Sequence, residues 1–202
     1  MKIKYAHPLA LSFSLAAIVF LGACGAENAS KGGAEGAAPA AAETETTAEA
    51  PAEAATDGGL TTLALTDVGT GESFTLADFS GQTVLVKPMA TWCGKCKKNL
   101  QGVKEATTQL GEGDYKIVAL SVEDKLPDED LAKYAETEEF EFTFAVASPE
   151  MMRALGKKYG QNVLNPSIGS RFIISPKGEL SELTTGAIEP GELVATLETA
   201  TQ

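Results

Sequence analysis

The sequence is poor in histidine, cysteine and basic side chains, and each shortage excludes a class of function. Histidine occurs once, at His7, and cysteine three times, at Cys24, Cys93 and Cys96. Three cysteines are too few for a disulfide-dense secreted scaffold. The chain has 16 Lys and Arg against 28 Asp and Glu, a net charge of −12. Nucleic acid is therefore not an expected partner, because an acidic chain repels phosphates.

The N-terminal residues are typical of an export signal. Lys2 and Lys4 precede an apolar run over residues 8–23, which serines interrupt and which is too short for a membrane span. The run ends in "LGAC", residues 21–24, which resembles the lipobox of bacterial lipoproteins. We therefore predict a lipoprotein signal peptide over residues 1–23 and a lipid anchor at Cys24. The alternative is an ordinary signal peptide with a cysteine near its cleavage site.

Export has consequences for the rest of the chain. The protein is expected in the cell envelope, held at the membrane by its lipid and facing the periplasm or the cell exterior, where disulfides persist. His7 leaves with the signal, so no imidazole remains for catalysis or metal binding. Residues 24–58 are rich in Ala, Glu, Thr and Gly and contain no aromatic residue, which predicts a disordered linker behind the lipidated cysteine.

From residue 59 to residue 202 the pattern indicates one folded domain. Continuous apolar runs predict buried strands over residues 83–90, 115–122 and 142–147, and an alternating run predicts a strand over 61–68. Helices are predicted over residues 97–113, 128–139, 149–160 and 189–202. The last helix follows a predicted hairpin of strands 170–175 and 179–186. This order predicts an α/β domain, a mixed sheet with helices on both faces.

Cys93 and Cys96 lie between a predicted strand and a predicted helix. A structural zinc site needs four ligands, and the domain offers two cysteines and no histidine, so neither a metal nor another cofactor is expected. Copper(I) accepts two thiolates, which leaves open a copper(I)-binding or redox-sensing module without turnover. A purely structural bridge is disfavoured because so short a loop gains little stability from closure.

Redox chemistry fits the position of the pair better. A thiol at the start of a helix lies in the positive end of the helix dipole, which lowers its pKa and makes thiolate available. Cys93 would be this nucleophile. Cys96, one turn further on, could resolve a mixed disulfide. Lys95, Lys97 and Lys98 add positive charge around the pair.

Four stretches carry a resemblance to a known family. They are "FTLADFSGQTVLVKPMATWCGKC", "YKIVALSVED", "LGKKYG" and "FIISPKGEL". In this order they resemble the membrane-anchored thiol–disulfide oxidoreductases of thioredoxin-like fold, the TlpA/ResA type. The resemblance covers residues 60–202. It implies thiol–disulfide exchange with exported proteins carrying disulfides, apocytochrome c among them, and electrons from a membrane thiol donor. Trp92 and Gly94 belong to its redox motif, "WCGKC".

The chain departs from the family pattern at three positions around the cysteines. Lys95 replaces a proline that usually precedes the second cysteine, and Asn99 replaces a frequent glutamate. Lys87 stands where thioredoxins keep a buried acid. We hypothesise that Lys87 approaches Cys96 and stabilises its thiolate or relays a proton. The alternative is a lysine that extends to solvent at the strand end.

The loop before residue 172 raises a further question. Thioredoxin folds place a cis-proline opposite the cysteines, three residues before a phenylalanine of the next strand. Counting back from Phe172 gives Gly169, and Pro166 lies three residues earlier. We favour Gly169 as the replacement, because the alignment then needs no gap. Trp92 is expected either to form an apolar platform beside the cysteines or to have a plain packing role.

Overall fold

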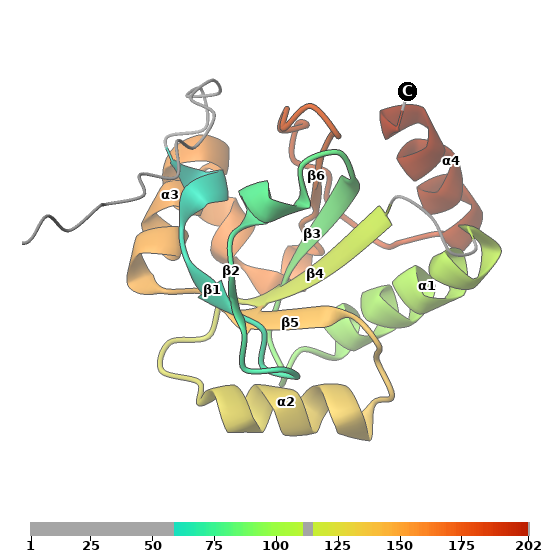
Figure 1. The fold of residues 1–202 in the computed structure, drawn as a ribbon. Coiled ribbons are helices and arrows are strands. Elements are labelled where there is room, and N and C mark those ends of the chain that lie inside the picture. The colour runs from blue at the N-terminus through green and yellow to red at the C-terminus, as the bar shows by residue number, and fades with distance from the viewer. Residues whose placement is uncertain (1–58, 111–114, 202) are drawn as a thin grey trace, which may run out of the picture. The chain divides into compact units, whose positions relative to one another are not determined.

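The computed structural model describes residues 59–110 and 115–201, all within one unit of the chain, Ala50–Gln202. The predicted signal peptide, the lipid site at Cys24 and the linker to residue 58 lie outside the described residues. The central sheet has the order β5-β4-β3-β6 (Figure 1). Strands β3 (Thr83–Met89), β4 (Tyr115–Ser121) and β5 (Thr143–Val146) run parallel, and β6 (Phe172–Ile174) pairs antiparallel with β3. The three predicted buried strands are thus confirmed.

Four helices complete the α/β fold. They are α1 (Gly94–Leu110), α2 (Asp128–Thr137), α3 (Pro149–Tyr159) and α4 (Pro190–Ala200), as predicted within a few residues. The limits of α3 follow directly from local chemistry. The Ser148 side chain accepts a hydrogen bond from the Met151 amide, Pro149 occupies the first turn, and Gly160 follows the last residue with positive φ.

The two faces of the sheet pack against different elements. On β3, Val84 and Val86 point into a core that includes Met151 and Leu155 of α3. Leu85 and Met89 point to the opposite face, which α1, α2 and α4 cover through residues such as Leu100, Leu131 and Leu197. Because side chains alternate along a strand, Lys87 belongs to this second face, beneath α1. The predicted sheet with helices on both faces is confirmed.

The prediction for residues 61–68 is wrong in extent. A 3-10 turn, η1 (Leu60–Thr62), precedes a strand of two residues, β1 (Leu65–Thr66), which pairs with β2 (Ser73–Phe74). Leu60 and Leu65 are both buried in the core on the α3 side. They are five residues apart, so in a straight strand they would face opposite ways. The turn brings both to the same core, with Leu76 from the second turn, η2 (Leu76–Phe79).

The predicted strand over residues 179–186 is also absent as a regular element. The hairpin after β6 contains only two isolated bridges, Arg171 with Thr184 and Ile174 with Leu180. Between them the Ser181 hydroxyl accepts the hydrogen bond of the Ile173 amide, at 2.9 Å. A side chain thus takes the place of a backbone acceptor, and the ladder is interrupted.

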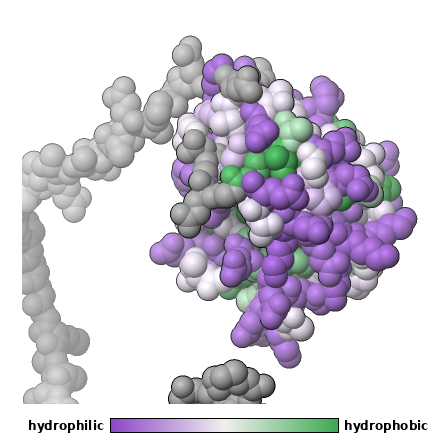
Figure 2. Space-filling model, turned by 90° about the vertical axis from the view of Figure 1, so that its right-hand side faces the viewer, coloured by the Kyte–Doolittle hydropathy of each residue, from purple (hydrophilic) through white to green (hydrophobic). Residues whose placement is uncertain are grey.

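The surface is largely polar. In the part of the chain that the structure describes, no helix combines the length and the apolar character needed to cross a membrane. Figure 2 shows the side on which α1 and α4 lie in Figure 1, and it is mostly hydrophilic, with hydrophobic surface in small patches. Among the described residues, Trp92 is the large hydrophobic side chain that is exposed.

Candidate active site

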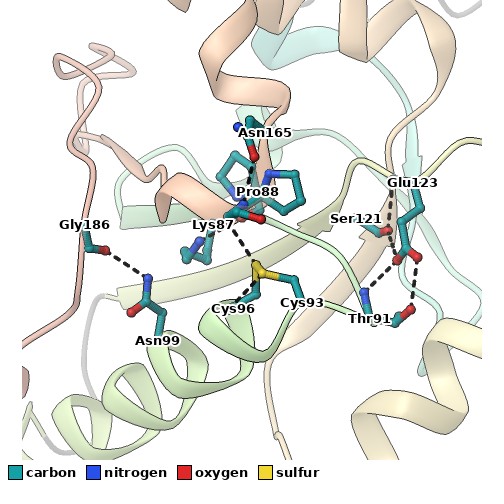
Figure 3. The surroundings of a disulfide bond; sticks show 12 residues. Lys87, Pro88, Thr91, Cys93, Cys96, Asn99, Ser121, Glu123, Asn165 and Gly186 are labelled. Atoms are coloured by element: carbon teal, nitrogen blue, oxygen red, sulfur yellow. Dashed lines mark hydrogen bonds between the residues drawn. A yellow bond between two sulfur atoms is a disulfide. The ribbon is translucent and has the colours of Figure 1, made fainter.

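The cysteine pair lies where β3 gives way to α1, and Cys93 and Cys96 are joined by a disulfide (Figure 3). Cys93 precedes the first residue of α1, and its carbonyl accepts the first helical hydrogen bond, from Lys97. Its sulfur accepts the amide hydrogen of Cys96 at 3.2 Å. Cys93 therefore caps the helix with its sulfur, the role that serine or aspartate usually fills. In the reduced protein an anionic sulfur would be the better acceptor, so this position favours thiolate.

The second sulfur has a different environment. The Sγ of Cys96 lies 3.2 Å from the carbonyl oxygen of Pro166. A carbonyl can only accept, so in the reduced protein this contact favours the protonated thiol. Cys96 is fully buried, whereas Cys93 is 4% exposed. The two sulfurs are thus unequal in their hydrogen-bond partners, and the surroundings of Cys93 favour the anion.

A carboxylate that the sequence did not single out fixes the loop before Cys93. Glu123, just after β4, accepts hydrogen bonds from the Thr91 amide at 2.7 Å and the Thr91 hydroxyl at 3.1 Å. The Ser121 hydroxyl donates to the same carboxylate at 3.1 Å (Figure 3). These bonds attach the cysteine loop to the end of the neighbouring strand. The parallel pairing of β3 and β4 was the only available signal, since it brings the ends of both strands together.

Lys87 is fully buried, so the alternative in which it extends to solvent is wrong. Its ammonium group donates to the carbonyl of Pro88 at 2.8 Å. Burial, with a smaller contribution from Arg171, lowers the pKa of Lys87 from 10.5 to about 7. The side chain lies on the same face of the sheet as the cysteine helix (Figure 3). Its role toward Cys96 stays a hypothesis.

Pro166 and Gly169 both reach the site, at different places. Pro166 begins a 3-10 turn, η4 (Pro166–Ile168), and supplies the carbonyl beside Cys96. The described residues contain no cis peptide bond, so Pro166 is trans. Gly169 ends the turn with a φ of 73°. A Cβ there would lie 2.8 Å from the Asn99 amide nitrogen and would overlap the carbonyl of Gly186, so the packing requires glycine.

Asn99 connects the cysteine helix to the loop before α4. Its side chain donates to the Gly186 carbonyl at 3.0 Å and accepts from the Ile188 amide at 3.3 Å (Figure 3). Asn99 is buried, and it replaces the glutamate that the resemblance led us to look for. An amide can both donate and accept, which a carboxylate cannot do. The substitution therefore closes this side of the site through neutral hydrogen bonds.

Trp92 and the lysines define the surroundings of the pair. Trp92 is 68% exposed, so most of its ring is available at the surface. It borders a hollow of about 330 Å³ with Ala90, Leu164 and Pro166. Lys97 forms an ion pair with Glu138 at 2.6 Å, and Lys104 donates to the Glu139 carbonyl at 2.6 Å. These two lysines secure α1 to the end of α2.

The described residues contain no group of three or more His, Cys, Asp or Glu side chains that could hold a metal ion. The two sulfurs are therefore the donors that this site could offer to a soft ion. Both are engaged with each other in the disulfide.

A helix-capping cysteine disulfide at the end of the central parallel strand, in a β5-β4-β3-β6 sheet, defines the thioredoxin-like class of thiol–disulfide oxidoreductases. The chain belongs to the Redoxin family, whose model matches residues 39–200.

Individual relatives agree with this assignment. The chain is similar to the thiol–disulfide oxidoreductase ResA of Oceanobacillus iheyensis, with 26% identity over 113 residues. That alignment covers 56% of this chain and spans only 54% of the relative's length.

Solved structures show the same fold. A thiol:disulfide interchange protein of the thioredoxin family from Chlorobium tepidum TLS has a TM-score of 0.56 at 19% identity. The match covers 68% of this chain and 92% of that protein's chain. The thioredoxin domain of a thiol–disulfide oxidoreductase from Bacteroides vulgatus has a TM-score of 0.55 at 19% identity. That match covers 69% of this chain and 93% of the solved chain. The predicted thioredoxin-like fold is confirmed.

Proposed function

We propose that the protein is an exported, lipid-anchored reductase of disulfides in exported proteins, with apocytochrome c among its clients. The observation that carries the proposal is the inequality of the two sulfurs. Cys93 caps a helix and accepts an amide hydrogen, while Cys96 is buried against a carbonyl. This is the arrangement expected of an attacking and a resolving thiol. The redox class of the family and of the ResA relative supports it.

The reaction begins from the reduced pair. The Cys93 thiolate attacks one sulfur of the client disulfide, that S–S bond breaks, and the other client sulfur leaves as a thiolate. Cys96 then attacks the Cys93 sulfur, the bond between Cys93 and the client breaks, and the proton of Cys96 passes to the departing client sulfur, which leaves as a thiol as the Cys93–Cys96 disulfide forms. Two electrons pass to the client. A thiol donor at the membrane would restore the reduced pair.

Reduction of insulin disulfides, driven by dithiothreitol, tests this activity in the purified full chain. We expect catalysed precipitation of the insulin B chain by the wild type and none by Cys93→Ser, because the attacking sulfur is gone. Tight binding of one copper(I) ion without insulin turnover would instead support the metal-binding alternative. The matched control is Cys24→Ser, which removes a cysteine but leaves the redox pair intact.

The anchor is tested separately, in cells. Because lipidation needs the Cys24 sulfur, we expect the wild type in the membrane fraction and Cys24→Ser in the soluble fraction after breakage. Mass spectrometry of the wild-type N-terminal peptide should show the added lipid. Equal partition of the two proteins would contradict the lipoprotein assignment and leave the redox proposal untouched.

A further inference from the structure

We infer that the site selects client segments that carry acidic side chains next to the reacting cysteine, held by Lys95 and Lys98. This inference rests on the proposed function and names its preferred substrate. A groove of about 480 Å³ lies between the first turns of α1, the helix that carries Cys96, and the loops at residues 167–169 and 186–187. Lys95 and Lys98, three residues apart on one side of α1, line this groove, and both are exposed.

The charges of the groove are available for a partner. Of the four lysines on α1, Lys97 and Lys104 are bonded to residues 138 and 139. Lys95 and Lys98 take part in no ion pair within the described ranges 59–110 and 115–201. Among the residues whose structure is described, none that lines the groove is acidic. In a chain of net charge −12, this is a local cationic surface beside the nucleophile.

The backbone of the facing loop is less available. The amide of Ser167 donates to the Asn165 side chain, that of Ile168 to the Asn165 carbonyl, and that of Gly169 to the Pro166 carbonyl. All three of these backbone amides are hydrogen-bonded within the loop, so none of them is available to pair with the backbone of an extended client. The two lysines are the charged side chains among the described residues that line this groove, so they can distinguish clients by charge.

The hollow beside Trp92 has acidic side chains in place of lysines, and of these Asp124 pairs with Lys125 at 3.8 Å. The hollow beside Trp92 is lined by Glu123 and Asp124 and by the apolar Val122, Leu164 and Pro166. A client segment bound over Cys93 would therefore contact Lys95 and Lys98 on one side. On the other side it would contact the apolar hollow beside Trp92, which also carries Glu123 and Asp124. Such complementarity acts on the rate of encounter and on the choice of partner, and salt screens it.

The test uses three matched disulfide peptides that differ only in flanking Asp, Asn or Lys. Each reacts with the reduced full chain, and the single tryptophan beside Cys93 reports oxidation by fluorescence. At low ionic strength we expect the Asp peptide to react about five- to tenfold faster than the Asn peptide. The Lys peptide should react more slowly than the Asn peptide. High salt should bring the three rates together.

Variants locate the effect. In K95Q/K98Q the Asp-to-Asn rate ratio should fall to about one. The ratio within one variant cancels any change in the chemistry of Cys93. K157Q/K158Q, on exposed positions of α3, changes net charge equally and should keep the wild-type ratio.

Two results would overturn the inference: a ratio near one in the wild type at low salt, or a preference that survives in K95Q/K98Q. Failure of the wild type to reduce uncharged hydroxyethyl disulfide would instead overturn the proposed function.

Discussion

Cys96→Ser is expected to turn the protein from a catalyst into a trap. Cys93 keeps its cap position and can still attack, but the mixed disulfide with the client has no resolving thiol. Turnover of insulin should fall by about two to three orders of magnitude. Non-reducing gel electrophoresis should show a covalent complex with the client that dithiothreitol releases.

The two single variants should differ in kind. Cys93→Ser loses the attacking sulfur, and Cys96 is fully buried against Pro166, so no covalent complex should accumulate. If Cys93→Ser forms the complex and Cys96→Ser does not, the assigned roles are reversed. Comparable complexes from both variants would mean that the two sulfurs are equivalent, against the asymmetry of their surroundings.

Lys87→Met is expected to stabilise the oxidised protein at acidic and neutral pH. Lys87 is fully buried, and its charged form is bonded only to the adjacent Pro88 carbonyl among the bonds that the structure describes. Methionine has a similar length and no charge, so it removes the desolvation penalty without leaving a large cavity. The free energy of unfolding should rise by about 1–3 kcal/mol at pH 6.

The pH dependence gives the sharper signature. The pKa of Lys87 is about 7 in the folded protein and 10.5 in the reference state, so between these values the unfolded chain binds more protons. Stability must then rise with pH across this interval. From pH 6 to pH 9 the expected gain is about 2–3 kcal/mol in the wild type. Lys87→Met should lack this gain.

Urea unfolding at pH 6 and pH 9 measures both effects. The half-buried tyrosines do not interfere, because the pKa of Tyr134 and Tyr159 is 10.0 in the reference state and burial raises it further in the fold, so neither titrates between pH 6 and pH 9. Equal slopes with pH in wild type and Lys87→Met would show that Lys87 does not titrate in this range. Alkylation of Cys93 in reduced wild type and reduced Lys87→Met tests the proton relay. If the alkylation rate depends on pH identically in both proteins, the relay is excluded.

The sequence predicted the parts of the molecule that depend on long local patterns. The continuous apolar run of residues 83–90 needs burial on both faces, and only the centre of a sheet provides this. The limits of α3 follow from Ser148, Pro149 and Gly160. Cys93 and Cys96 could be placed at the strand-to-helix junction because both flanking elements have strong signals.

The remaining features depend on contacts between distant residues. Glu123 follows β4 and bonds Thr91, 32 residues earlier. Asn99 bonds residues 186 and 188, 87 and 89 residues away. A single sequence contains no local sign of such pairs. The prediction of one strand over residues 61–68 failed for a related reason. The burial of Leu60 and Leu65 in one core, and not the alternation of apolar residues, determines the backbone conformation there.

The division of the lysines also needed the structure. In the sequence, Lys95, Lys97, Lys98 and Lys104 form one basic segment. In the fold, the end of α2 lies beside one side of α1, where residues 138 and 139 bond Lys97 and Lys104. The loop at residues 186–187 approaches the other side of α1. The helix period separates charges that secure the fold from charges that a client can meet.

The proposed chemistry requires that the surroundings of Cys93 hold its sulfur as an anion near neutral pH. The most direct measurement is the rate of iodoacetamide alkylation of Cys93 in the reduced full chain from pH 4 to pH 10, resolved by mass spectrometry of its peptide. We expect a midpoint near or below about pH 7, against about 8.5 for free cysteine. A midpoint at or above that of free cysteine would show that the helix cap does not activate Cys93.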